Sequence, residues 1–102
     1  MSVTVINKNN FEQEVMQSDR PVLLDFYATW CGPCRMLSPI VDKIAAEHSD
    51  IKVCKINVDD EEELAMRFEV MSIPTLVVIK NGEVANKSVG ALPEARILAM
   101  IK

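Results

Sequence analysis

The sequence predicts a three-layer α/β/α sandwich built on a mixed central sheet of five strands. Apolar segments that suit strands alternate with segments of helical periodicity, which is typical of α/β proteins. A nearly continuous apolar run at residues 22–28 indicates a strand buried on both faces, as central strands are. An Asn-Gly pair at positions 81–82 separates two strand-like runs, which predicts a hairpin and therefore a mixed sheet. With 102 residues, we expect one domain over residues 1–102.

The first half of the chain predicts two strands and two helices. Residues 3–6 are all β-branched and favour a short strand. Asn10 can cap a helix over residues 11–18, with Gln13 completing a capping box. After the strand at 22–28, a helix should begin between Cys31 and Pro33, because proline is favoured in a first turn. Its apolar face follows helical spacing: Leu37, Ile40, Val41 and Ile44.

The second half completes the sheet. Residues 51–58 predict a strand, and the order strand, helix, strand implies a right-handed parallel unit. Asp60 and Glu63 indicate the capped start of a short helix. The hairpin strands are expected at residues 75–79 and 84–89, the second at an edge because it carries polar residues. Pro93 should begin a last helix.

Charge and cysteine content exclude several classes of protein. Asp and Glu total 15 against 11 Lys and Arg, a net charge of −4, which disfavours nucleic acid or an anionic membrane as a partner. The apolar runs are too short to cross a bilayer. The N-terminus lacks the features of a secretion signal, so we expect a cytoplasmic protein. Three cysteines are too few, and odd in number, for a disulfide framework; they should be reactive, metal-binding or buried.

The segment Cys31-Gly32-Pro33-Cys34 lies where a strand leads into a helix. Two residues between cysteines on a first helical turn allow the sulfurs to form a disulfide. Free backbone N–H groups and the helix dipole favour the thiolate of Cys31, while Cys34 lies one turn deeper. We therefore expect an exposed nucleophilic sulfur and a sheltered one that resolves a mixed disulfide, as thiol–disulfide exchange requires. Because Gly32 and Pro33 add no cation, the dithiol should act as a reductant.

The sequence Trp30-Cys31-Gly32-Pro33-Cys34-Arg35-Met36, followed by Pro39, resembles the thioredoxin family. The resemblance extends almost to the last residue and includes several further matching segments. These are Asp25-Phe26, Lys55, Ser72-Ile73-Pro74-Thr75, Asn81-Gly82 and Val89-Gly90-Ala91. A CxxC motif alone is weak, but this set in this order is highly specific.

The resemblance implies a thioredoxin fold and a protein-disulfide reductase that needs no dissociable cofactor and no metal. It also implies a cis bond before Pro74, a thioredoxin reductase as partner, disulfide-containing protein substrates and a monomeric state. Asp25 would assist deprotonation of Cys34 through water, tuned by Lys55. The substrate would bind on a flat apolar surface formed by Trp30, Gly32, Pro33, Ile73, Pro74, Gly90 and Ala91.

The same residues allow other interpretations. Cys31, Cys34, His48 and Cys54 form an allowed Cys3His set for zinc, although the helix between Cys34 and His48 separates them. The same surface could serve a binding module in which the cysteines are incidental. Cys54 is expected to be a small buried hydrophobic residue. Asp25 could instead form a structural ion pair with Lys55.

Overall fold

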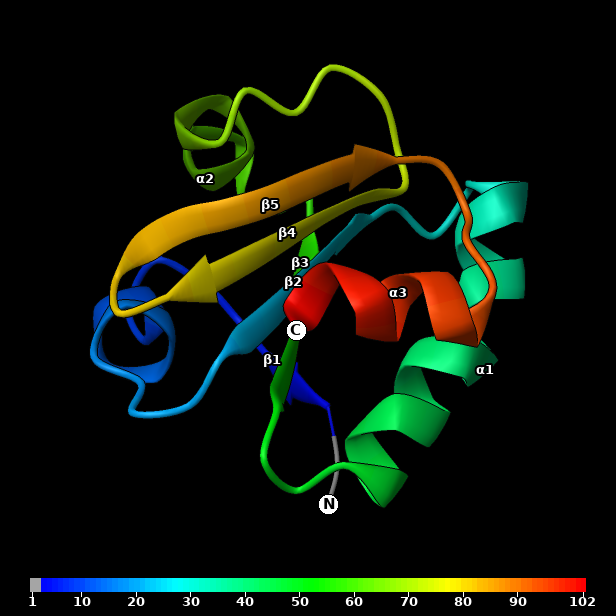
Figure 1. The fold of residues 1–102 in the computed structure, drawn as a ribbon. Coiled ribbons are helices and arrows are strands. Elements are labelled where there is room, and N and C mark those ends of the chain that lie inside the picture. Colours follow the sequence, from blue (N-terminus) through cyan, green and yellow to red (C-terminus); the bar gives the residue numbers. More distant parts are fainter. Residues whose placement is uncertain (1–2) are drawn as a thin grey trace.

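The computed structural model describes residues 3–102 and has the predicted sandwich, with helices on both faces of one sheet (Figure 1). The five strands lie in the order β1-β3-β2-β4-β5. β2 pairs in parallel with β3 and antiparallel with β4, so the sheet is mixed, as predicted. The strands are β1 (Thr4–Val5), β2 (Val22–Tyr27), β3 (Lys52–Asn57), β4 (Thr75–Lys80) and β5 (Glu83–Val89). The helices are η1 (Glu12–Met16), α1 (Gly32–Glu47), α2 (Glu62–Arg67) and α3 (Glu94–Ile101).

Two hydrophobic clusters divide the core between the sheet faces. On one face, side chains of β2 and β3 such as Leu24, Phe26 and Cys54 pack with η1 and α2. On the other, alternate residues such as Leu23 and Val53 pack with α1 and α3. This alternation follows from the period of two in a strand. It places Asp25 and Lys55, which are adjacent in register, on the face that α1 covers.

The local sequence explains the central elements well. β2 is buried from Val22 to Phe26, which confirms the prediction of a strand covered on both faces. The turn between β4 and β5 has positive φ angles of 54° at Asn81 and 77° at Gly82, the conformation that an Asn-Gly hairpin adopts. β5 is mostly exposed at the sheet edge, as its polar residues predicted.

Two predicted helix starts are wrong in detail. The segment after β1 forms a π-helix, η1, and neither Asn10 nor Gln13 caps it. Instead, the Asn7 side chain accepts hydrogen bonds from the backbone N–H groups of Asn9 and Asn10, which orders the approach to the helix. No side chain caps α2 either, so Asp60 does not have the expected role. Several Asn and Asp side chains compete for each cap, and neighbouring elements decide between them.

Candidate active site at the start of α1

The first turn of α1 holds the two cysteines of the motif. Cys31 is the N-cap residue, with extended backbone, and Pro33 lies in the first turn, as predicted. Cys31 and Cys34 form a disulfide with their Cα atoms 5.3 Å apart. The backbone N–H of Cys34 donates to Cys31 Sγ at 3.2 Å. A sulfur atom therefore takes the capping position that a side-chain oxygen usually fills.

The expected difference in exposure between the two sulfurs is wrong for this disulfide form. The exposed fraction of Cys31 is 5% and that of Cys34 is 4%, so both residues are buried. The difference lies in their hydrogen bonding and position. Cys31 Sγ accepts an N–H at the positive end of the α1 dipole, which is the environment that stabilises a thiolate after reduction.

Across from the disulfide lies the segment before β4. The bond between Ile73 and Pro74 is cis, as the resemblance implied. The carbonyl oxygen of Ile73 lies 3.9 Å from Cys31 Sγ. The backbone N–H of Gly90 donates to the carbonyl oxygen of Pro74 at 2.8 Å, and Gly90 has a φ of 99° that favours glycine. The hairpin end thus holds the Pro74 segment beside the cysteines, and Ala91 follows it as an exposed residue.

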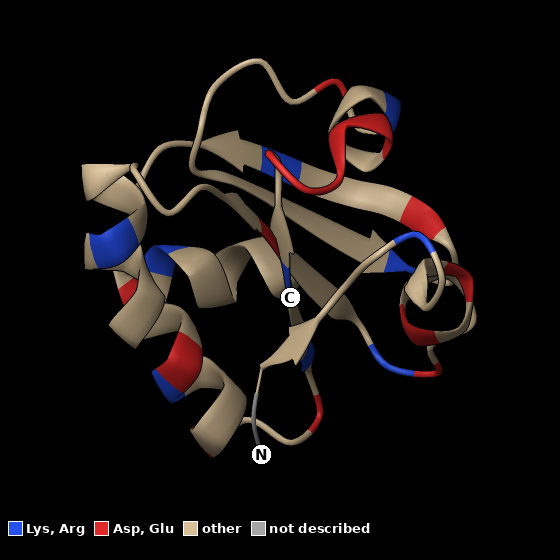
Figure 2. Cartoon of the chain, turned by 180° about the vertical axis from the view of Figure 1, so that it is seen from behind, with Lys and Arg blue, Asp and Glu red and all other residues tan. Residues whose placement is uncertain are grey.

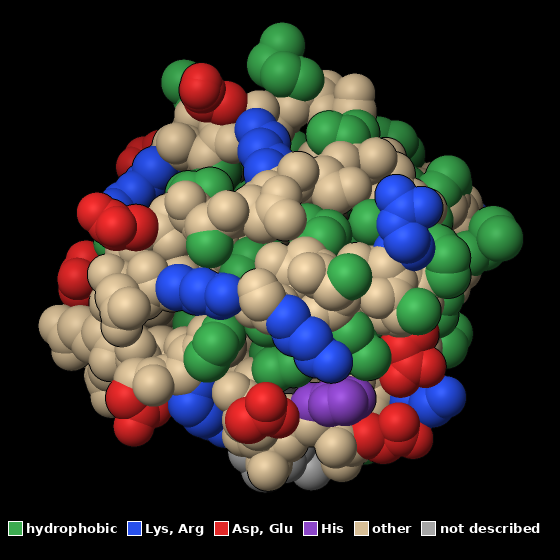
Figure 3. Space-filling model, viewed as in Figure 1, with side chains coloured by type: hydrophobic (Ala, Val, Ile, Leu, Met, Phe, Trp, Pro, Cys, Tyr) green, Lys and Arg blue, Asp and Glu red, His purple; other side chains and the backbone are tan. Residues whose placement is uncertain are grey.

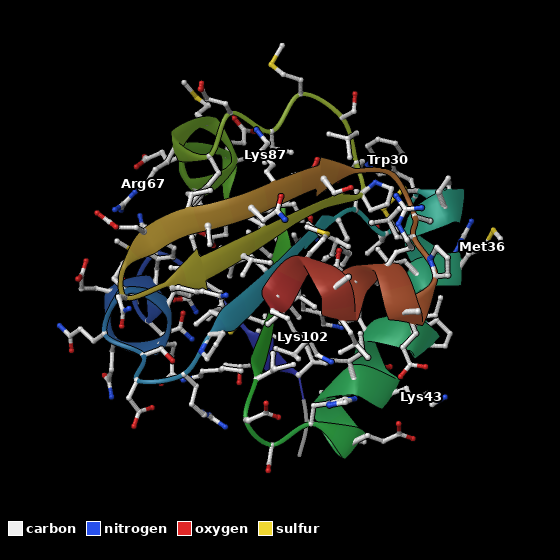
Figure 4. All side chains as sticks on the ribbon, viewed as in Figure 1. Trp30, Met36, Lys43, Arg67, Lys87 and Lys102 are labelled. Atoms are coloured by element: carbon white, nitrogen blue, oxygen red, sulfur yellow. A yellow bond between two sulfur atoms is a disulfide. The ribbon has the colours of Figure 1, made fainter. Side chains whose placement is uncertain are left out.

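An apolar groove of about 430 Å³ lies beside this segment, lined by Trp30, Val58, Val70, Met71, Ser72 and Ile73. Trp30 is 67% exposed, and its indole N–H donates to the Asp59 carboxylate at 2.9 Å. Figure 4 shows Trp30 and Met36 near the start of α1, and hydrophobic side chains gather at the same edge in Figure 3. Gly32 and Pro33 are exposed beside them.

A second pocket, of about 250 Å³, lies behind the disulfide. Asp25 of β2, Lys55 of β3, and Cys34 and Ser38 of α1 line it, together with Tyr27, Ala28, Thr29 and Arg35. Asp25 is only 4% exposed, and its Oδ1 has no hydrogen-bond partner within residues 3–102. A buried acid therefore shares a pocket with the deeper cysteine.

Burial raises the pKa of Asp25 from 3.8 to about 7, because a charged carboxylate loses its hydration there. Lys55 lowers this pKa and Asp42 raises it, both by charge and both less than burial does. Lys55 makes no direct ion pair with Asp25 among the described residues. Its ammonium lies 5.3 Å from the centroid of the Tyr27 ring. Lys55 therefore acts on Asp25 by charge without a direct ion pair among the described residues.

These features match one known family. The family model described as Thioredoxin matches residues 2–102. The chain belongs to the thioredoxin family. It is 50% identical over 98 residues to a thioredoxin from Porphyra purpurea, covering 95% of this chain and 92% of the relative. Identity to a thioredoxin from Haemophilus influenzae is 48% over 97 residues, covering 94% and 91%.

Solved structures agree with this thioredoxin assignment. The crystal structure of a Malassezia sympodialis thioredoxin, Mala s 13, aligns with a TM-score of 0.87 at 35% identity, covering 97% of this chain and 88% of that one. The protein is a thiol–disulfide oxidoreductase. Thioredoxins act through their own dithiol and disulfide without an external cofactor, on disulfide substrates, and are re-reduced by a reductase.

The remaining cysteine of this thioredoxin lies apart from the disulfide. Cys54 is free and fully buried in β3, on the opposite sheet face from Asp25, as a small hydrophobic residue would be. Burial raises its thiol pKa to about 11. Because Cys54 packs in a different cluster from Cys31 and Cys34, the Cys3His set does not assemble among the described residues.

One other group has the composition of a metal site. The ligand atoms of Glu47, His48 and Glu94 lie within 4.8 Å of one another where α1 ends and α3 begins. Lys43 pairs with Glu94 at 3.1 Å, so an ammonium already balances this acidic group. No helix in residues 3–102 has both the length and the apolar character that a membrane crossing requires.

Sequence reasoning missed two residues of the site. Asp59 directly precedes the helix start predicted at Asp60, and Figure 2 shows acidic residues leading into α2. Its hydrogen bond to Trp30 depends on how β3 and the Trp30 loop meet, which no local pattern reveals. Ser38 could have been found, because its spacing of four residues from Cys34 places both on one face of α1.

Proposed function

We propose that this thioredoxin reduces protein disulfides, with Cys31 as the nucleophile and Cys34 as the resolving thiol. The observation that carries this proposal is the N–H of Cys34 donating to Cys31 Sγ at the start of α1. One sulfur thereby receives the stabilisation that a thiolate needs at neutral pH. The other sulfur belongs to Cys34, which lies in the first turn of α1 and lines the pocket that contains Asp25.

In the first step, the Cys31 thiolate attacks one sulfur of the substrate disulfide. A bond forms between Cys31 and that sulfur, and the substrate disulfide breaks. The second substrate sulfur leaves as a thiolate and takes a proton from water. The product is a mixed disulfide between Cys31 and the substrate.

In the second step, Cys34 loses its proton to the Asp25 carboxylate through water. The Cys34 thiolate then attacks Cys31 Sγ, which forms the Cys31–Cys34 disulfide and releases the reduced substrate. Two electrons have passed from the dithiol to the substrate. Asp25 suits this role because its pKa of about 7 lies near the operating pH, and Lys55 tunes that value.

The substrate is expected to lie as an extended segment against the Ile73–Pro74 backbone, as a short added strand. The distance of 3.9 Å from the Ile73 carbonyl oxygen to Cys31 Sγ supports this placement. The apolar side chains around the groove would contact it. We assign this binding surface to Trp30, Gly32, Pro33, Ile73, Pro74, Gly90 and Ala91.

The proposed cellular role is that of a cytoplasmic electron carrier. Its partners are thioredoxin reductase, which regenerates the dithiol, and disulfide-containing proteins. We propose that residues 1–102 act as one domain and as a monomer, without nucleic acid or membrane partners. The net charge of −4 supports the last point, because both of those partners reward a basic surface.

The test is reduction of insulin disulfides by the purified protein, with thioredoxin reductase and NADPH supplied. We expect catalytic NADPH oxidation that depends on both insulin and this protein. The matched control is a Cys31→Ser, Cys34→Ser double variant. If that variant supports the same rate, the cysteines are incidental and the protein acts as a binding module.

A further inference from the structure

We propose that the hydroxyl of Ser38 is a positioning group that holds the water through which Cys34 passes its proton to Asp25. This inference rests on the proposed function and adds a residue to its second step. Ser38 lies one helical turn after Cys34 in α1 and is half-buried. Both residues line the 250 Å³ pocket that also contains Asp25.

The pocket is large enough for water and offers polar partners, including Asp25, Ser38 and Lys55, within a largely apolar lining. A water molecule occupies about 30 Å³ of liquid and needs two to four polar partners, so a 250 Å³ pocket has room for more than one. Asp25 Oδ1 is buried and has no partner within residues 3–102, so it can accept a proton donated from this pocket. The relay therefore has an acceptor at one end and the Cys34 thiol at the other.

Ser38 is the group best suited to hold water between these ends. A relay partner must both accept and donate hydrogen bonds, and a hydroxyl does both, whereas an ammonium only donates. Lys55 is thus limited to orienting the water or the carboxylate. Arg35 and Thr29 line the pocket but are exposed. Ser38 also lies one turn from Cys34 on the same helix, so their Cα atoms keep a fixed spacing and both side chains reach the same pocket.

The proton of Cys34 reaches Asp25 in two transfers. The Cys34 thiol gives its proton to the water held by Ser38, and this water gives a proton to Asp25. The Cys34 thiolate attacks Cys31 Sγ, the Cys31–substrate bond breaks, and the substrate sulfur leaves with the electron pair. The charged and titratable groups around Asp25 are Lys55 from β3, Tyr27 from β2, and Cys34, Arg35 and Asp42 from α1.

The experiment is stopped-flow reaction of the reduced protein with excess dithiobis(nitrobenzoate). Attack by Cys31 releases the first coloured thiolate at a rate that depends on reagent concentration. Resolution by Cys34 releases the second at a rate that does not. For Ser38→Ala we expect an unchanged first phase and a second phase about fivefold slower, the effect of losing one hydrogen bond. Alanine favours helix, so the variant should fold.

Three further variants make the test decisive. Ser38→Thr keeps the hydroxyl and should restore most of the second-phase rate. In an Asp25→Asn background, Ser38→Ala should cause no further slowing, because the relay has lost its acceptor. Ser49→Ala removes the hydroxyl of an exposed serine that does not line the pocket, and it should leave the second phase unchanged.

Three results would overturn the role of Ser38: an unchanged second phase in Ser38→Ala, a further slowing by Ser38→Ala in the Asp25→Asn background, or an equal slowing in Ser49→Ala. Failure of the proposed second step, in which Asp25 accepts the proton, can be distinguished from failure of the role of Ser38. In that case Asp25→Asn by itself would leave the second phase at the original rate.

Discussion

Asp25 and Cys54 occupy neighbouring central strands and face opposite sides of the same sheet. Both are buried, and burial raises the pKa of each, to about 7 for Asp25 and about 11 for Cys54. Asp25 opens onto a pocket shared with Cys34, whereas Cys54 is fully enclosed by apolar side chains. A raised pKa therefore indicates a functional residue only where a reacting group has access to the buried titratable group.

The largest expected effect separates the two kinds of cysteine. Replacing Cys31 or Cys34 with serine should reduce turnover in the insulin assay to the background rate, because each step loses its sulfur. Cys54→Ala should keep nearly the full rate, with a loss of about 1–2 kcal/mol in the free energy of unfolding from the small cavity. If Cys54→Ala remained folded but lost turnover, Cys54 would have to take part in the chemistry.

Thiol reactivity in the reduced protein should differ nearly as strongly. At pH 7 a thiol of pKa about 11 is ionised in roughly one molecule in ten thousand, and burial excludes reagents as well. Iodoacetamide labelling mapped by mass spectrometry should therefore find Cys31 modified first and Cys54 unmodified until the protein unfolds. Faster labelling of Cys34 or Cys54 would reverse the assigned roles.

Stability should depend on pH through Asp25. Its pKa is higher in the folded state than the 3.8 of an ordinary aspartate, so the unfolded state releases its proton first as pH rises. The fold is favoured below about pH 4, loses stability between pH 4 and 7, and stays less stable above. Relative to the original protein, the free energy of unfolding of Asp25→Ala should rise by about 4 kcal/mol between pH 4 and pH 8. Urea melts of both proteins at pH 4 and pH 8 measure this difference. If the difference in the free energy of unfolding were the same at both pH values, the raised pKa of Asp25 would be contradicted.

The smallest expected effect concerns Trp30, which lines the apolar groove beside the Ile73–Pro74 segment. Asp59→Ala removes the acceptor that orients the Trp30 indole. The bond is exposed, so its loss should raise the KM for insulin about twofold and leave kcat unchanged. Trp30→Ala serves as the comparison and should raise KM further. An unchanged KM in both variants would exclude Trp30 from the substrate surface.

Sequence predicted those parts of the fold that depend on local physics. The buried run of β2, the Asn81-Gly82 turn and the start of α1 at Cys31 each follow from residue type and spacing. The π-helical form of η1 and the use of Asn7 were missed, because neighbouring elements select among competing polar residues.

The candidate site likewise has features that the sequence predicts and features that it does not. The two cysteines follow from the motif, and the cis bond before Pro74 follows from the family resemblance. The similar burial of residues Cys31 and Cys34 and the hydrogen bond from Trp30 to Asp59 were not predicted, because they arise where separate elements meet. The pocket joining Asp25, Cys34 and Ser38 likewise requires three elements packed together.

The most direct test of the central claim is a carbon NMR titration of the Asp25 side-chain carboxyl in the disulfide form of the protein. We expect a midpoint near pH 7, because burial beside the pocket disfavours the charged carboxylate. A midpoint near pH 4, like that of an exposed aspartate, would contradict the claim that Asp25 is a proton acceptor matched to neutral pH.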